Sequence, residues 1–162
     1  MGAQQLEVKQ SADAKKPGKA LSRLELGMLP GLIGYQLRLA QRAIFADFAK
    51  NVGDDIGPGL FGILVVIEAN PGLKQQRLAE AAHLDRSTVV AVIDKLESRG
   101  LVERRAADRR SNGLYLTAQG AELLRSLKRK VQQHERRVLQ RLTPQERDEL
   151  SRLLDLILPE RR

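Results

Sequence analysis

The chain has 162 residues, no cysteine and a formal net charge of +8 at neutral pH. This length suffices for one domain with a real core, or for a small domain joined to an oligomerisation element. The lack of cysteine excludes a thiol redox sensor and a thiolate metal site, and His83 and His134 lie too far apart in sequence to indicate zinc. No apolar run reaches the roughly 18 residues of a membrane span. We therefore expect a cytoplasmic protein with no metal, no cofactor and no membrane partner.

The positive charge is unevenly distributed along the chain. Residues 51–117 hold nine Lys and Arg against nine Asp and Glu, and are neutral. Residues 118–147 hold eight basic and three acidic side chains. Bulk charge is therefore weak evidence for nucleic-acid binding, and a DNA-binding surface in residues 51–117 would need its arginines sorted onto one face.

The first third of the chain predicts a polar arm and two helices. Residues 1–27 are expected to form a disordered basic arm, with an idle solvated tail as the alternative. A helix is predicted from Pro30 to about Lys50, where apolar residues recur at helical spacing. Pro58 opens a second helix that runs to Ala69 and is apolar all round, which is typical of a buried helix.

The middle of the chain predicts a helix pair followed by a β-hairpin. Gln75–Ala82 forms a short helix, and Asp85 caps a second one that ends before Gly100. In Leu101–Thr117, two apolar runs flank a polar loop that carries four arginines. Asn112-Gly113 supplies residues that tolerate positive φ, so we expect a hairpin turn there and an arginine-rich tip.

Two further helices complete the pattern. Thr117 caps a helix predicted over residues 118–142, and Thr143-Pro144-Gln145-Glu146 is a capping box that starts another helix ending near Leu158. The last helix carries an apolar stripe that a small winged helix would leave uncovered: Leu150, Leu153, Leu154, Ile157 and Leu158. Such a stripe favours a homodimer.

These elements predict a mainly α fold with a small β-hairpin wing, that is, a winged helix-turn-helix plus a helical dimerisation region. The DNA-binding lobe is placed at residues 53–117, and the dimerisation region at residues 28–52 and 118–162. At the start of the second helix of the pair, Arg86 could bond a guanine edge or a phosphate, and small polar residues beside it suit the major groove. An ordinary amphipathic helix pair with a solvated face is the alternative, and the basic hairpin shifts the balance toward DNA.

The same residues resemble a known family. The run Asp108–Thr117, DRRSNGLYLT, is similar to the wing pattern D-x-R-S-x-x-L-x-L-T of the MarR family of bacterial transcription regulators, and residues 86–102 resemble its recognition helix and first wing strand. The resemblance covers about residues 28–158. It implies an obligate homodimer that places two recognition helices in the major groove and two wings in the minor groove of a palindromic operator.

By this resemblance, Asp108 holds the wing while Arg109 and Arg110 contact DNA. Asp94 either pairs with a wing arginine and aims it or is a solvated carboxylate. The predicted DNA contacts combine the outward residues of the helix pair with the wing: Gln75, Arg86, Ser87, Thr88, Ala91, Lys95, Arg104, Asp108, Arg109, Arg110 and Ser111.

The family resemblance also implies a small anionic or phenolic effector, bound between the dimer helices and the DNA-binding lobe. The predicted ligand contacts are Tyr35, Arg38 and Arg42, which share a helix face, and Phe45, Phe48 and Phe61, which could wall an apolar pocket. Arginines beside aromatic rings suit an aromatic carboxylate. The alternative is that the arginines are solvated and the phenylalanines belong to the core.

Residues 37–48 and 67–72 are similar to a subgroup that represses hydroxycinnamate and related aromatic catabolism, some of whose members sense an aromatic acyl-CoA. The positive charge of residues 118–147 could then bind the CoA phosphates, or it could attract DNA over a distance.

We therefore expect a ligand-responsive homodimeric repressor. One alternative is a constitutive or architectural DNA-binding protein without an effector, and another is a winged helix that binds protein instead of DNA. An enzyme is not expected, because the sequence has no Ser-His-Asp or Cys-His arrangement and no phosphate-cradling glycine loop.

Overall fold

The computed structural model describes residues 24–53, 55–108 and 111–158, except for the side chains of residues 107, 108 and 111. The chain divides into two compact units, Met1–Gln36 and Leu37–Arg162. In the first unit the described residues form a 3-10 turn, η1 (Leu29–Gly31), followed by the start of helix α1. The predicted arm of residues 1–27 lies almost wholly outside the described residues.

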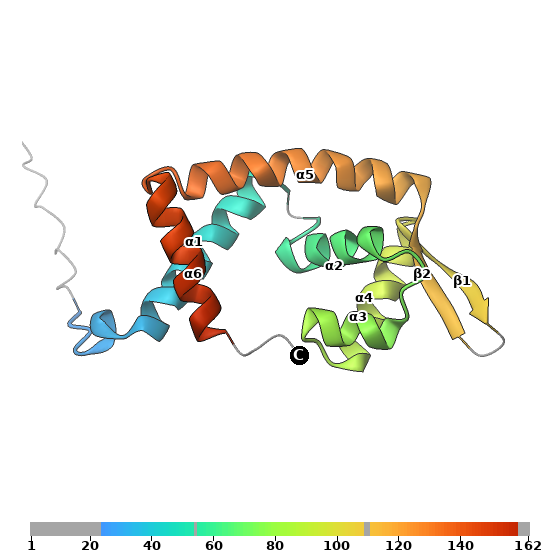
Figure 1. Ribbon diagram of the computed structural model, residues 1–162, viewed down its shortest axis with the longest axis horizontal. Coiled ribbons are helices and arrows are strands. Elements are labelled where there is room, and N and C mark those ends of the chain that lie inside the picture. The colour runs from blue at the N-terminus through green and yellow to red at the C-terminus, as the bar shows by residue number, and fades with distance from the viewer. Residues whose placement is uncertain (1–23, 54, 109–110, 159–162) are drawn as a thin grey trace, which may run out of the picture. The chain divides into compact units, whose positions relative to one another are not determined.

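The described residues form the mostly helical fold with a two-stranded hairpin that the sequence predicts (Figure 1). The elements in chain order are α1 (Ile33–Asn51), α2 (Pro58–Ala69), α3 (Gln75–Ala82), α4 (Arg86–Ser98), β1 (Val102–Asp108), β2 (Ser111–Leu116), α5 (Ala118–Val138) and α6 (Pro144–Ile157). The predicted first helix differs at its start, because Pro30 lies in η1 and α1 begins at Ile33. α5 also ends four residues earlier than predicted.

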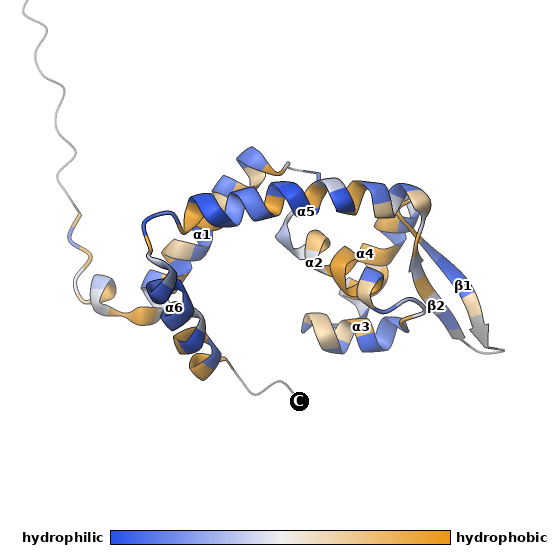
Figure 2. Cartoon of the chain, turned by 45° about the horizontal axis from the view of Figure 1, so that its top comes forward, coloured by the Kyte–Doolittle hydropathy of each residue, from blue (hydrophilic) through white to orange (hydrophobic). Residues whose placement is uncertain are grey.

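The hydrophobic core of the second unit is built around α2. Leu64 and Ile67 of α2, Ile93 of α4 and Leu124 of α5 are almost completely buried. Figure 2 shows the hydrophobic colour gathered between α5 and α3, where α2 and α4 lie. Residues 60–67 of α2 are all buried or half-buried, which explains the nearly continuous apolar sequence of this helix.

Side-chain caps fix the helix ends locally. The Asp85 carboxylate accepts from the Thr88 N–H, and the Thr117 hydroxyl accepts from the Gly120 N–H. Thr143 and Glu146 form the predicted capping box at the start of α6. Gly100 has a φ of +67° and ends α4, as predicted.

The hairpin is present, but the prediction of its turn is wrong. Asn112 and Gly113 lie within β2, paired with Ala106 and Arg105 of β1, so the strands extend past the expected turn. Gly113 is not among the glycines with positive φ. Because the strands are longer than predicted, Arg104 and Arg105 lie on β1 and not in a loop. Arg109 and Arg110, two of the predicted DNA contacts, lie outside the described residues.

Gly113 is required for a different reason, which is a close backbone approach. The segment before α3 pairs with β2: the Gly72 N–H donates to the Leu114 carbonyl, and the Leu114 N–H donates to the Leu73 carbonyl. A Cβ on Gly113 would lie 2.8 Å from the Gly72 Cα. The hairpin is thereby joined to the helix-turn-helix at its root.

Among the described residues, no helix is both long and apolar enough to cross a lipid bilayer.

Candidate nucleic-acid interface

The start of α4 is stabilised by a carboxylate that binds two hydroxyl groups. The Ser87 hydroxyl donates to Asp85 Oδ1 at 2.5 Å, and the Thr88 hydroxyl donates to Asp85 Oδ2 at 2.6 Å. These hydrogen bonds, that of Ser87 first, hold the pKa of Asp85 well below its usual range. In this state the two hydroxyl protons are engaged within the cap. A DNA contact by Ser87 or Thr88 as a donor would therefore require them to leave Asp85.

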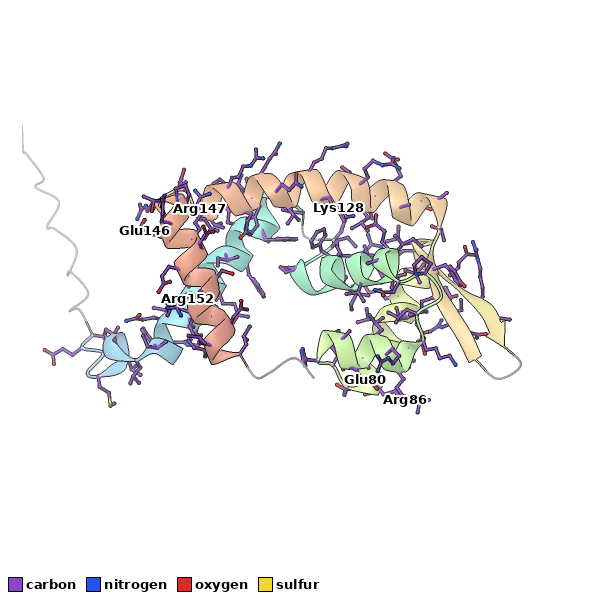
Figure 3. The ribbon with its side chains drawn as sticks, in the orientation of Figure 1. Glu80, Arg86, Lys128, Glu146, Arg147 and Arg152 are labelled. Atoms are coloured by element: carbon purple, nitrogen blue, oxygen red, sulfur yellow. The ribbon has the colours of Figure 1, made fainter. Side chains whose placement is uncertain are left out.

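The other predicted residues of α4 form an open surface. Arg86, Ala91 and Lys95 are all exposed. Figure 3 shows Arg86 at the start of α4, directed away from the surrounding ribbons. The long donor expected at the N-terminal end of a recognition helix is therefore accessible to a duplex.

Arg104 of β1 is enclosed by carboxylates and is not displayed at a wing tip. Its Nη2 donates to Asp94 Oδ1 at 2.5 Å and its Nη1 donates to Glu97, while its backbone N–H donates to Glu97 Oε1 at 3.2 Å. Its side chain is only 22% exposed. Burial alone lowers the pKa of Arg104, but the hydrogen bonds and charges of Asp94 and Glu97 outweigh burial and raise it. The structure thus shows Asp94 paired with a wing arginine, one of the two alternatives that the sequence left open.

Gln75, the first residue of α3, joins the same cluster. With its amide oxygen turned toward Arg104, Gln75 accepts from Nη2 at 2.9 Å and from Nε at 3.0 Å. Beside this pair lies a hollow of about 420 Å³, which we call the wing-root hollow. It is lined by Lys74, Gln75, Gln76, Arg86, Arg104, Asn112 and Leu114.

Arg105, the next residue on β1, faces a different environment. Its guanidinium lies 4.8 Å from the centre of the Tyr115 ring and donates to Glu103 Oε1 at 2.5 Å. Sequence reasoning grouped Arg104 and Arg105 in one loop, and it missed Glu97 as a partner of Arg104. The spacing of Asp94 and Glu97, one helical turn apart, was the available sign that both could reach one side chain.

The predicted ligand residues differ in their environments. Phe48 is only 3% exposed, packs against Phe61 with ring centres 6.5 Å apart, and forms a T-shaped contact with His134 with ring centres 5.3 Å apart. Phe48 and Phe61 therefore belong to the core and its margin, the alternative that the sequence left open. Phe45 is 46% exposed, and Arg38 and Arg42 are also exposed on α1. Tyr35 lies in the first unit. A ligand site built from these residues stays a prediction.

Part of the positive charge of residues 118–147 is neutralised within the chain. Arg137 donates to both oxygens of Asp47 on α1, with Nη2 at 2.7 Å from Oδ1, and Nδ1 of the buried His134 lies 2.7 Å from the same Oδ1. The bonds from Arg137 and then His134 hold the pKa of Asp47 well below its usual range. Lys128 pairs with Glu68 of α2. These contacts tie α5 to α1 and α2.

Other basic side chains of the same stretch remain exposed. Arg129, Arg136 and Arg141 are all exposed. In the described part of the chain, no three His, Cys, Asp or Glu side chains are arranged to hold a metal ion.

The comparisons with known proteins match this arrangement. The MarR family model matches residues 58–111, from α2 into the wing. A protein of Thauera aromatica, named for transcriptional regulation of the hcr operon, is 38% identical over 144 residues, covering 86% of this chain and 87% of its own. The chain belongs to the MarR family. This membership makes it a winged helix-turn-helix transcription regulator, a class that binds DNA.

Solved MarR-family structures agree with this assignment. The transcriptional repressor CouR bound to a 23-mer DNA duplex is 37% identical, with a TM-score of 0.76, covering 84% of this chain and 99% of that one. CouR bound to p-coumaroyl-CoA is 36% identical, with a TM-score of 0.77, covering 83% and 96%. These MarR-family relatives are named as regulators and repressors, not as enzymes.

Proposed function

We propose that this MarR-family chain is a homodimeric repressor that an aromatic acyl-CoA releases from a palindromic operator. The observation that carries the proposal is the similarity to CouR, which has been solved both on DNA and with p-coumaroyl-CoA. The chain matches both structures over more than four fifths of its length. A regulator that binds both DNA and an acyl-CoA can release DNA when the acyl-CoA shifts the population between two shapes of the dimer.

The uncovered apolar surface of the described residues supports the homodimer. Large exposed hydrophobic side chains gather in residues 24–33, along α1 and along α6. The exposed residues of α6 include the predicted stripe members Leu150, Leu153 and Ile157, and Leu158, which follows the helix, is also exposed. Apolar surface of this extent is typical of an interface, and a symmetric dimer would cover the same faces on both copies.

Exposed cations support an effector that carries negative charge. Arg38 and Arg42 lie on α1 one turn apart, and Arg129 and Arg136 are exposed on α5. A CoA thioester brings several phosphate charges, whereas a free aromatic acid brings one carboxylate. Guanidinium groups bind phosphate and carboxylate oxygens strongly, so they suit either ligand.

The test is the release of DNA by three ligands. A labelled duplex from the DNA flanking the chain's own gene is first saturated with protein and followed by fluorescence anisotropy. We expect p-coumaroyl-CoA at micromolar concentration to release it, and free p-coumarate and free CoA to require at least about 100-fold more, because each lacks part of the contacts.

Two other outcomes decide between the functions that remain. If none of the three ligands changes the affinity for DNA, the constitutive DNA-binding protein replaces the effector-responsive repressor. If the protein binds no duplex, the winged helix that binds another protein becomes the better account.

A further inference from the structure

Each nitrogen of the Arg104 guanidinium has an acceptor within the protein. Its Nη1 donates to Glu97, its Nη2 donates to Asp94, and Nη2 and Nε both face the Gln75 amide oxygen at 2.9 and 3.0 Å. An arginine side chain has five N–H donors in a fixed fork, and here all three nitrogens of the fork have acceptors. A bidentate contact from Arg104 to a base would break several of these bonds at once.

The contact with Arg104 gives the Gln75 amide one orientation. A glutamine that reads adenine must accept from N6 and donate to N7 with the same amide, so it needs both its oxygen and its nitrogen. Because a guanidinium can only donate, the Gln75 atom that faces Arg104 must be the oxygen, which is then not available to a base. What remains for a ligand is the NH₂ group, which can only donate.

The surroundings of Gln75 favour a negatively charged acceptor. Gln75 lines the wing-root hollow together with Lys74, Arg86 and Arg104. Two carboxylates, Asp94 and Glu97, pair with Arg104, so Lys74 and Arg86 leave an excess of positive charge around the hollow. A donor-only amide beside basic side chains suits a backbone phosphate oxygen of a duplex seated on α4 and the wing.

We propose that Gln75 is a phosphate contact whose amide is oriented by Arg104, and that Arg104 is a positioning residue and not a DNA contact. This inference rests on the proposed function, because it requires that the lobe binds DNA. Arg104, which the sequence predicts as a DNA contact, instead orients the Gln75 amide that makes the contact. Gln75 then helps to position the protein on DNA, without a part in sequence selection.

The first test uses two variants of Gln75 and one matched control. Gln75→Met removes the donor and the acceptor, and should weaken operator binding about tenfold, with a similar loss on unrelated DNA because phosphates carry no sequence. Gln75→Glu keeps an acceptor for Arg104 but has no donor. It should preserve the melting temperature and weaken binding at least as much as Gln75→Met. Gln76→Glu makes the same charge change one residue away and should lose severalfold less.

Three results would overturn the assignment of Gln75. Gln75→Glu that binds no worse than Gln76→Glu would mean that the amide donates nothing to DNA. Gln75→Met that changes the preference at one base pair, and keeps full affinity for other sequences, would make Gln75 a base contact. If wild type binds DNA and both Gln75 variants match it, the inference fails alone; if wild type binds no DNA, it fails together with the proposed function.

The second test measures whether Arg104 acts through Gln75. Arg104→Lys keeps the positive charge, but a lysine has no planar guanidinium and cannot bind Gln75, Asp94 and Glu97 at the same time. We expect it to weaken DNA binding severalfold in the wild-type background and less in the Gln75→Met background, as a double-mutant cycle detects. A purely structural loss would be equal in both backgrounds, and equal losses would contradict the positioning role. Melting temperatures of all four proteins show whether each is folded.

Discussion

Gly120→Ala should destabilise the protein by about 3 kcal/mol or more, because its added methyl group has no room and its neighbour is backbone. A Cβ at Gly120 would lie 1.9 Å from the Leu101 carbonyl oxygen. That carbonyl also accepts from the Thr117 N–H, so it is held in place at the junction of α4, β1 and α5. The clash between the new methyl group and this carbonyl can be relieved only if α5 moves away from the wing. Denaturant unfolding followed by far-UV circular dichroism measures the loss, and the chain has no tryptophan to follow by fluorescence.

A second glycine provides the control for this prediction. Gly62 lies inside α2, and a Cβ there would meet no atom within 4 Å. Gly62→Ala should therefore be neutral or stabilise the protein by roughly 0.4–1 kcal/mol, through the loss of unfolded-state freedom. Both variants must be compared at one protein concentration, because a dimer's apparent stability depends on it. An unchanged denaturation midpoint for Gly120→Ala would contradict the close contact between α5 and the Leu101 carbonyl.

If the chain is the homodimer proposed above, Leu153→Glu should convert it to a monomer and weaken operator binding by at least about 100-fold, because the two half-sites would no longer be bound by linked subunits. Leu153 is 43% exposed on α6, within the apolar stripe that would pack against the partner copy in the proposed dimer. A glutamate there would place an unpaired charge in an apolar interface. Light scattering gives the mass, circular dichroism confirms that helices persist, and anisotropy gives the DNA affinity.

Gln145→Glu is the matched control on the same helix. It adds the same charge at an exposed position in the first turn of α6, where a carboxylate is favourable. It should leave the mass and the DNA affinity unchanged. A Leu153→Glu protein that stays dimeric with wild-type affinity for DNA would remove α6 from the interface.

Features set by a few neighbouring residues were predictable from sequence. α3 has the predicted limits, and the caps at Asp85 and Thr143 formed as expected, because each joins a side chain to a backbone N–H three residues on. The burial of α2 was also predictable, because its apolar pattern is contained within one short stretch of sequence. Its Pro58 start also followed from local backbone preference.

Features set by distant segments were not predictable. The pair Asn112-Gly113 has the composition of a hairpin turn, yet Gly113 is required by the approach of Gly72 from before α3. The environment of Arg104 depends on α3, α4 and β1 together, and no local pattern contains all three. Phe48 is predicted as a ligand contact because it lies near Phe45 and Phe61 in the sequence, but nearness in sequence cannot distinguish a pocket wall from a core residue.

The proposed binding of a palindromic DNA sequence by a symmetric dimer is tested most directly by selecting bound duplexes from a random pool with the wild-type protein. We expect enrichment of two inverted half-sites, with centres about 10 base pairs apart or at a multiple of that spacing. Binding of the enriched duplex should exceed that of unrelated DNA by about 1,000-fold or more at physiological salt. Recovery of no common sequence, or of a single unrepeated half-site, would contradict the proposed binding.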